Sequence, residues 1–146
     1  MHGLRKLLLP FSWIYGSILS LRHLLYDRGI LKSYKPVQKT IVVGNLSLGG
    51  TGKTPMVDYL VSLLGMTGIA VLSRGYGRKT KGTLIVSADM TVKECGDEPI
   101  LLKRKHPELL VIVDANRTRA LEFLRVSHSE IKTVILDDAM QHRKIN

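Results

Sequence analysis

The sequence predicts an α/β fold in which a parallel sheet carries helices on both faces. Short runs of β-branched and other apolar residues alternate along the chain with segments in which apolar residues recur at helical spacing. Such alternation favours a parallel sheet with helices packed against it. The chain has 146 residues, of which 45% are hydrophobic, and this is enough for one domain with its own core.

The first region, residues 1–32, differs in composition from the rest. Arg5 and Lys6 precede an apolar run of fifteen residues, 7–21, and Arg22 follows it. This run is shorter than the roughly 20 residues of a spanning helix, and no cleavage site typical of a signal peptide follows it. One set of residues recurs at three- and four-residue steps (Phe11, Ile14, Ile18, Leu21, Leu25), and another face carries Ser12, Gly16 and Ser20. The pattern predicts an amphipathic helix that lies in a membrane interface or, alternatively, packs on the following domain.

The second region, residues 39–146, holds the predicted sheet. The expected strands span 40–43, 69–72, 83–86, 110–113 and 133–136, and the expected helices span 56–64, 99–105 and 118–126. Domains of this kind normally continue with further strands beyond the last one predicted. We therefore expect the chain to be a fragment, truncated at the C-terminal end of this domain.

A glycine-rich segment follows the first expected strand and opens the next helix. It is Ser47-Leu48-Gly49-Gly50-Thr51-Gly52-Lys53-Thr54, in the strand–loop–helix context of a P-loop, with Ser47 where the usual pattern has glycine. A P-loop wraps phosphates with backbone N–H groups, its lysine reaches the β- and γ-phosphates, and its hydroxyl residue ligates Mg²⁺. The segment predicts a P-loop NTPase-type sheet that binds ATP and Mg²⁺, with Lys53 as a catalytic residue and Thr54 as a metal ligand.

Two acidic residues, Asp137 and Asp138, follow the last expected strand. An apolar strand that ends in acid is the Walker B arrangement, which places a carboxylate near the metal of a P-loop. Both aspartates are candidate metal ligands, and we expect one of them to be a helix cap or a solvated residue instead. His142 follows closely and is a candidate to face the nucleotide.

Two further segments carry candidate functional residues. Arg74 and Arg78 lie on a glycine-rich loop after a strand end, where open α/β sheets bind ligands. They form either a clamp for a substrate phosphate or part of a solvated surface. Asp97 lies in Gly96-Asp97-Glu98-Pro99, before an expected helix, and is either a helix-terminal acid or the base that takes a proton from an acceptor hydroxyl.

The charge balance restricts the class of partner. With 22 Lys and Arg against 12 Asp and Glu, the formal net charge is +10, which indicates an anionic partner: nucleic acid, an acidic membrane surface or a phosphorylated substrate. Aromatic residues make up only 5% of the chain and do not alternate with the basic ones, so we expect no nucleic acid. The single cysteine, Cys95, excludes an internal disulfide, and no His and Cys cluster has the spacing of a zinc site.

Taken together, these segments resemble the lipid A 4'-kinase (tetraacyldisaccharide 4'-kinase) family. The matching segments are Val43 to Leu46, Gly49 to Pro55, Leu72 to Arg78, Gly96 to Pro99, and Asp137-Asp138 with Gln141-His142-Arg143. The resemblance implies a kinase at the cytoplasmic face of the bacterial inner membrane, peripheral or monotopic. It would transfer the γ-phosphate of ATP to the 4'-hydroxyl of an acylated glucosamine disaccharide 1-phosphate, giving lipid IVA. It also implies that Asp97 is the catalytic base and that Asp137 and Asp138 are the Walker B acids.

Two departures from the family pattern stand out. Ala139-Met140 replaces the Gly-Phe that usually follows the paired aspartates, which we expect to be tolerated. Family members are also much longer, and their C-terminal part completes the nucleotide site and supplies a histidine partner for the base. We therefore expect this chain alone to be inactive.

Two other functions compete with a kinase. A membrane-recruited P-loop ATPase switch would share the glycine-rich loop and the amphipathic segment, but it would not require Arg74, Arg78 or Asp97. A basic nucleic-acid binder would account for the charge alone, and its binding to DNA would depend steeply on salt.

Overall fold

The computed structural model describes residues 2–31, 33–44 and 52–138, with side chains described from residue 12 onward. The chain forms two compact units, Met1–Tyr34 and Lys35–Asn146. The domain limits expected from the sequence, 1–32 and 39–146, stay predictions.

The first unit is built on one long helix, α1 (His2–Asp27). Trp13, Ile14 and Ile18 are exposed over 77%, 59% and 59% of their surface, and neighbouring polar residues are exposed as well, so the predicted membrane-facing side of the helix stays a prediction. The Arg22 guanidinium lies over the ring of Tyr26, 5.7 Å from its centroid. Within the described residues, no helix has both the length and the apolar character that crossing a membrane demands.

The second unit contains a five-stranded sheet in the order β1-β5-β2-β4-β3. The strands are β1 (Lys39–Val43), β2 (Ile69–Ser73), β3 (Leu84–Ile85), β4 (Leu110–Val113) and β5 (Thr133–Asp137). β1, β5, β2 and β4 run parallel to one another. These four lie within one residue of the expected ranges, which confirms the predicted parallel arrangement for the body of the sheet.

The edge strand β3 differs from the prediction. It is shorter than the expected 83–86, and it pairs antiparallel with β4. A parallel neighbour needs a crossover connection, usually a helix. The connection from β2 to β3 contains no helix, and Gly75, Gly77 and Gly82 adopt positive φ angles of 67°, 74° and 81° along it, so the chain turns back instead of crossing over.

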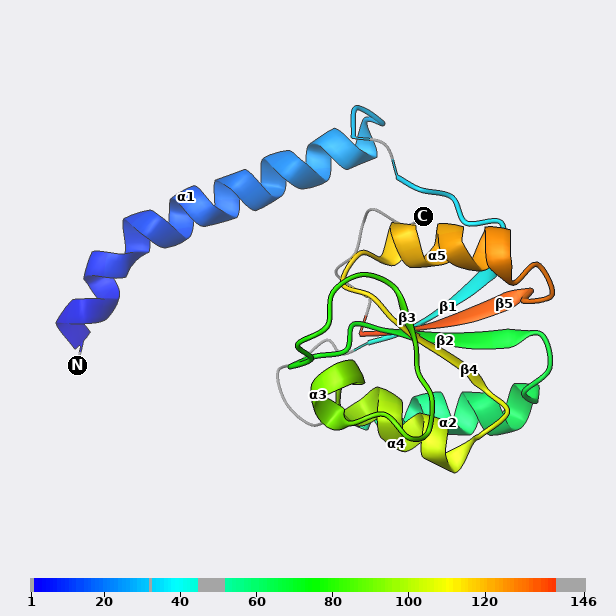
Figure 1. Ribbon diagram of the computed structural model, residues 1–146. Coiled ribbons are helices and arrows are strands. Elements are labelled where there is room, and N and C mark those ends of the chain that lie inside the picture. Colours follow the sequence, from blue (N-terminus) through cyan, green and yellow to red (C-terminus); the bar gives the residue numbers. More distant parts are fainter. Residues whose placement is uncertain (1, 32, 45–51, 139–146) are drawn as a thin grey trace. The chain divides into compact units, whose positions relative to one another are not determined.

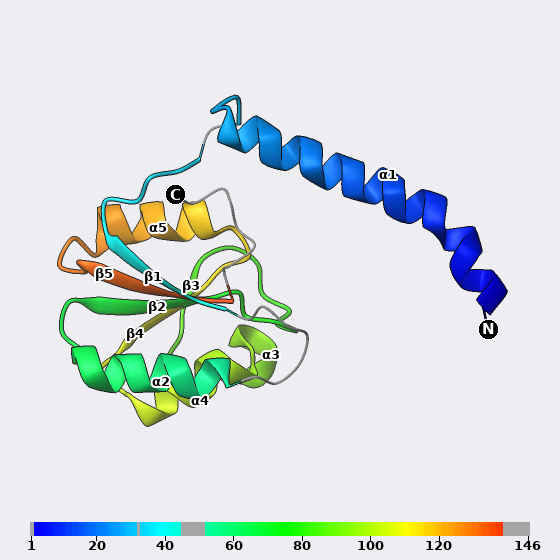
Figure 2. The same cartoon turned by 180° about the vertical axis from the view of Figure 1, so that it is seen from behind.

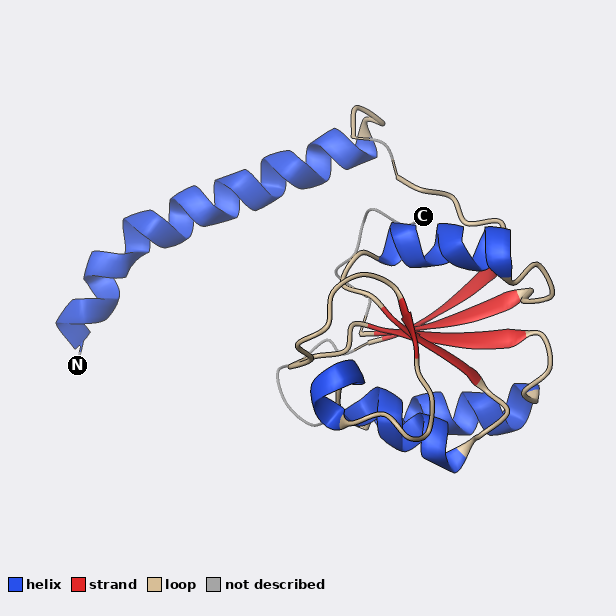
Figure 3. Ribbon diagram, in the orientation of Figure 1, coloured by secondary structure: helices blue, strands red, loops and turns tan. Residues whose placement is uncertain are grey.

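Helices cover both faces of this sheet, as Figures 1 and 2 show from opposite sides. The helices are α2 (Lys53–Leu64), α3 (Val92–Cys95), α4 (Asp97–Lys105) and α5 (Arg117–Ser127). α2, α3 and α4 lie on one face and α5 on the other (Figure 3). The three expected helices are confirmed, each starting one to three residues earlier than predicted, whereas α3 was not expected.

The hydrophobic core lies between the sheet and these helices. Every residue of the central strand β2 is buried, as expected for a parallel strand covered on both faces. Val57 and Val61 of α2 and Ile100 of α4 pack against one face, and Leu121 of α5 is buried on the helix covering the other. Because four strands are parallel, their carboxyl ends meet at one edge of the sheet, where ligands bind in such folds.

Candidate active site at the carboxyl edge of the sheet

The predicted P-loop falls partly within the described residues. Ser47, Leu48, Gly49, Gly50 and Thr51 lie outside them, as do Gln141, His142 and Arg143. Gly52 precedes α2 in a left-handed conformation, with φ 79° and ψ 24°, and Lys53 and Thr54 are the first two residues of the helix. The structure therefore places the Lys53 ammonium and the Thr54 hydroxyl at a helix N-terminus, where phosphate groups are favoured.

Lys53 contacts the end of β5. Its Nζ lies 2.8 Å from Oδ1 of Asp138, and this hydrogen bond is the main reason why the pKa of Lys53 is raised. Asp138 has a φ of 53°, the one positive φ of a non-glycine residue in the described part of the chain. Such a conformation is uncommon for residues other than glycine, and its presence beside the P-loop lysine points to a functional constraint.

Asp137 is the buried member of the acidic pair, with 5% of its surface exposed. Its Oδ2 accepts a hydrogen bond of 3.3 Å from the Ser73 hydroxyl, whereas its Oδ1 is buried without a partner among the described residues. Burial, followed by the negative charge of Glu98, raises the pKa of Asp137. A buried carboxylate oxygen without a partner fits a bound cation, because a cation would offset the cost of burying its charge.

Glu98 is a site residue that sequence reasoning missed. The Thr54 hydroxyl donates to Oε1 of Glu98 over 3.2 Å, which joins the first turn of α2 to the first turn of α4. No group of three or more His, Cys, Asp or Glu side chains with metal-binding geometry occurs among the described residues. Mg²⁺ needs no such cage, since proteins usually hold it with one or two carboxylates and the phosphates of the substrate.

Asp97 is the exposed residue that opens α4. Its Oδ1 accepts a hydrogen bond of 2.9 Å from the backbone N–H of Glu98. The described contacts do not join its carboxylate to Lys53 or to Asp138. The role of Asp97 as a base therefore stays a prediction, while its neighbour Glu98 reaches the start of α2.

The turn after β2 packs closely against the turn that starts α4. A Cβ atom on Gly75 would lie 2.9 Å from the carbonyl oxygen of Cys95, and one on Gly96 would lie 3.1 Å from Cα of Gly75. Both glycines have positive φ, 67° and 97°. Only glycine permits this backbone approach, so the loop that carries Arg74 and the residue before Asp97 are held together.

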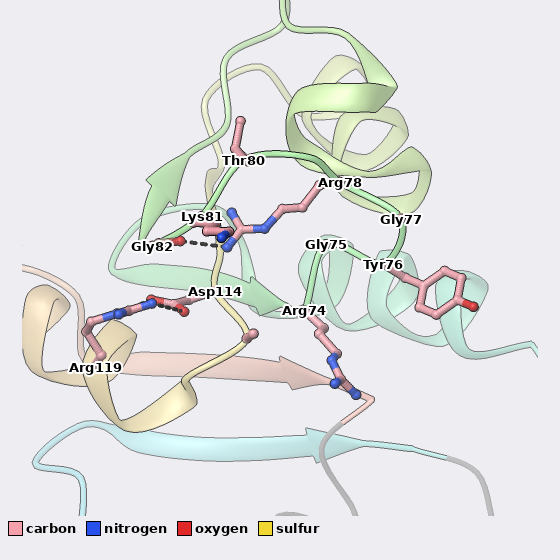
Figure 4. Close-up of a pocket in the computed structure, with 11 residues that line it drawn as sticks. Arg74, Gly75, Tyr76, Gly77, Arg78, Thr80, Lys81, Gly82, Asp114 and Arg119 are labelled. Carbon is pink, nitrogen blue, oxygen red and sulfur yellow. Dashed lines mark hydrogen bonds and ion pairs between the residues drawn. The ribbon is translucent and has the colours of Figure 1, made fainter.

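A cavity of about 520 Å³ lies beside this contact. Its walls are residues 74–78, 80–82, 114, 115 and 119. The guanidinium of Arg78 donates to the carbonyl oxygens of Val113 and Gly82, at 3.1 Å and 2.6 Å, and burial lowers its pKa. In Figure 4 Arg74 projects away from Arg78, so the structure does not bring these two guanidinium groups together.

Asp114 and Arg119 form a further pair that sequence reasoning missed. Asp114 is fully buried after β4 and accepts hydrogen bonds of 2.8 Å and 2.7 Å from Nε and Nη2 of Arg119 (Figure 4). It also accepts one of 2.6 Å from the Thr83 hydroxyl. Burial alone would raise the pKa of Asp114, but these hydrogen bonds outweigh it and the pKa is lowered. The pair fixes one cation at the wall of the cavity.

Comparison with known proteins decides the family. The family model of tetraacyldisaccharide-1-P 4'-kinase, LpxK, matches residues 4–146. This chain belongs to the tetraacyldisaccharide 4'-kinase family. It is 46% identical to the tetraacyldisaccharide 4'-kinase of Flavobacterium johnsoniae over 99% of this chain and 43% of that protein, and 45% identical to the Porphyromonas gingivalis protein over 97% and 41%.

A solved structure supports the same conclusion. The chain superposes on the crystal structure of the "apo" form of LpxK from Aquifex aeolicus in complex with ATP with a TM-score of 0.84 and 44% identity, over 98% of this chain and 46% of that one. The tetraacyldisaccharide 4'-kinase fold is thereby confirmed for the matched part. The chain spans less than half the length of the relatives it matches.

Proposed function

We propose that the full-length protein transfers the γ-phosphate of ATP to the 4'-hydroxyl of a tetraacyldisaccharide 1-phosphate, giving lipid IVA. The observation that carries this proposal is the convergence of Lys53, Thr54, Glu98 and the Asp137–Asp138 pair at the carboxyl edge of the sheet. Membership of the tetraacyldisaccharide 4'-kinase family and the likeness to an ATP complex support it.

The ATP phosphates are held by the loop from Ser47 to Thr54, with the Lys53 ammonium on the β- and γ-phosphates. Thr54 and Asp137 would hold Mg²⁺, which would offset negative charge on the transferring phosphoryl group. Asp137 is suited to this role because its Oδ1 is buried and has no partner among the described residues. Glu98 lies at hydrogen-bond distance from the Thr54 hydroxyl, and Asp138 orients Lys53 by the contact between their side chains.

Asp97 takes the proton from the acceptor hydroxyl. Its carboxylate is exposed at the start of α4 and next to Glu98, so an acceptor can reach it from solvent. The backbone N–H of Glu98 donates to its Oδ1 and orients it, which leaves the other carboxylate oxygen available to the acceptor.

The cavity beside Gly75 receives the phosphate of the acceptor. Neither Arg74 nor Lys81 forms an ion pair with another described residue, and both line the cavity with Arg119. Arg78 also lines the cavity and adds positive potential. Its two Nη atoms donate to the carbonyl oxygens of Val113 and Gly82 and so fix the conformation of the loop between β2 and β3. Four cations line the cavity and one of them is paired with Asp114, so the excess of positive charge favours a doubly charged phosphate.

The N-terminal unit holds the protein on an anionic membrane surface at the cytoplasmic face of the inner membrane. The exposed apolar side chains of α1 supply the apolar contact with the lipid, and the net charge of +10 supplies electrostatic attraction. A lipid acceptor requires such placement, because its acyl chains stay in the bilayer.

The test is an assay of the full-length protein with γ-labelled ATP, Mg²⁺ and tetraacyldisaccharide 1-phosphate. We expect label to appear in the lipid, and Lys53→Ala to lower kcat/KM by more than about tenfold. Lys93→Ala, which removes an exposed lysine from α3, is the matched control and keeps wild-type activity. Release of labelled phosphate at the same rate with and without the lipid would instead favour an ATPase switch.

A further inference from the structure

Arg117 is the largest fully buried side chain among the described residues, with 2% of its surface exposed. It is the first residue of α5, directly after the N-cap residue Asn116. Burial lowers the pKa of Arg117, and the negative charge of Asp137 partly offsets this effect. A guanidinium group is costly to bury unless hydrogen bonds compensate it, so its partners indicate what it does.

Both partners of Arg117 are main-chain carbonyl groups at strand ends. Nη1 donates to the carbonyl oxygen of Asp114, after β4, and Nη2 donates to that of Asp137, at the end of β5, each over 2.7 Å. β2 lies between these two strands in the sheet. Within the described part of the chain Arg117 forms no ion pair with a carboxylate, and its Nε has no partner. The planar fork of an arginine donates from two separate nitrogens in fixed directions, whereas a lysine has a single, freely rotating ammonium group.

The carbonyl oxygen of Asp137 belongs to the peptide that joins Asp137 to Asp138. When that oxygen is held, the plane of this peptide is fixed, and this plane is the reference from which φ of Asp138 turns. Asp138 has the left-handed φ of 53° and presents its Oδ1 to Lys53 at 2.8 Å. A conformation of this kind persists only where the surroundings impose it.

We propose that Arg117 is a positioning residue for phosphoryl transfer: its hydrogen bond to the Asp137 carbonyl holds the peptide that leads into Asp138, and so the place from which the left-handed Asp138 sets its carboxylate on Lys53. This inference rests on the proposed function, in which Lys53 binds the ATP phosphates. Arg117 does not touch ATP itself, because its side chain is enclosed by protein. It acts through the acidic pair at the end of β5.

The experiment compares Arg117→Lys and Arg117→Met in the full-length protein. We expect both variants to raise KM for ATP and lower kcat, with a loss in kcat/KM for ATP of about tenfold or more, while KM for the lipid acceptor stays within about twofold. Arg117→Lys keeps the charge and much of the volume, so it remains informative if Arg117→Met fails to fold. Arg125→Met, on the half-exposed part of the same helix, is the matched control and retains wild-type constants. A variant that folds, shown by thermal unfolding, and keeps wild-type constants overturns the inference.

A double-mutant cycle tests the route through Asp138. If Arg117 acts through Asp138, adding Arg117→Lys to Asp138→Asn lowers kcat/KM for ATP by less than about twofold relative to Asp138→Asn alone. If the losses of the two single variants multiply in the double variant, Arg117 acts independently of Asp138 and the inference is overturned.

ATP affinity, measured by isothermal titration calorimetry, separates this inference from the proposed function. Weaker ATP binding by Arg117→Lys supports the positioning role even if the wild-type protein transfers no phosphate to the lipid, in which case the proposed function alone fails. Unchanged ATP binding together with unchanged kinetics overturns the positioning role and leaves the proposed function intact.

Discussion

The hydroxyl of Thr54 lies 3.2 Å from the carboxylate of Glu98, although 44 residues separate them in the chain. The contact brings the start of α2, which carries the P-loop lysine, against the start of α4, which carries Asp97. Two helices that begin side by side thus present the groups assigned to the donor and to the acceptor of one reaction.

The two adjacent acids of α4 should give different kinetic signatures. Asp97→Asn keeps size but loses basicity, so kcat should fall by about 10²–10⁴-fold with little change in KM for ATP, because a base contacts the acceptor. Glu98→Gln alters the partner of Thr54, so it should change KM for ATP and the Mg²⁺ dependence as well. Steady-state kinetics of both variants in the full-length protein check this. A large rise in KM for ATP in Asp97→Asn with kcat preserved would move Asp97 to the nucleotide site.

Deletion of residues 1–26 should release the full-length protein from anionic vesicles. The lost segment carries the exposed apolar residues of α1, whose burial in lipid is insensitive to salt, and several basic residues whose attraction is screened. Co-sedimentation with vesicles measures binding, and high salt should weaken that of the undeleted protein only in part. Equal binding by the two proteins would contradict the membrane role of α1.

Asp58 should make stability depend on pH through its contacts with the end of α4. Its carboxylate lies 2.6 Å from Nζ of Lys105 and 2.7 Å from Nε2 of His106, and these two hydrogen bonds, Lys105 first, lower the pKa of Asp58. A depressed carboxyl pKa stabilises the fold above the unfolded value of about 3.9. That contribution is lost as pH falls through the lower pKa of the folded state.

Thermal unfolding of Asp58→Asn checks this dependence. At pH 7 the variant should be less stable than the wild type by about 0.5–1 kcal/mol, and the difference should shrink as pH drops below 4. Glu108→Gln removes an exposed acid nearby and controls for the change in net charge. A difference that stays constant from pH 7 to the acid limit would exclude the linkage.

Gly75→Ala should destabilise the protein more than Gly77→Ala. Both glycines have positive φ, at 67° and 74°, so both substitutions cost about 1 kcal/mol for the backbone. Only at Gly75 would the new Cβ meet the Cys95 carbonyl at 2.9 Å, whereas at Gly77 nothing lies within 4 Å. Overpacking should add about 1–3 kcal/mol, measured by denaturant unfolding. Equal losses of unfolding free energy at the two positions would show that the close approach of Gly75 to the Cys95 carbonyl does not affect stability.

The sequence predicted the four parallel strands well because each is a continuous apolar run with a clear end. It missed α3, although Thr91 and Glu94 form a capping box in which the Thr91 N–H donates to Glu94, and this signal is visible in the sequence. It also missed the antiparallel pairing of β3 with β4, because a glycine-rich connection can lead into a strand of either direction.

The sequence predicted only those residues of the candidate site that belong to a known local motif. Lys53, Thr54 and the acidic pair follow from local patterns, and the structure brings Lys53 and Asp138 together. Arg117 could not be found, since an arginine at a helix start is ordinarily solvated and its partner Asp137 is 20 residues away. For Arg78 the sequence left open a phosphate clamp or a solvated surface, and it could not reveal the contacts of its guanidinium with the carbonyl oxygens of Val113 in β4 and Gly82 in the loop.

The contact between Gly75 and Gly96 also constrains how this fold can be altered. A side chain at Gly96 would meet the backbone of Gly75, and one at Gly75 would meet the Cys95 carbonyl next to Gly96, so neither segment tolerates exchange without the other. Anyone who grafts the acceptor-side residues onto a different P-loop scaffold must transfer the turn after β2 and the start of α4 as one unit. During divergence, too, the two turns are expected to drift as a correlated pair and not as separate loops.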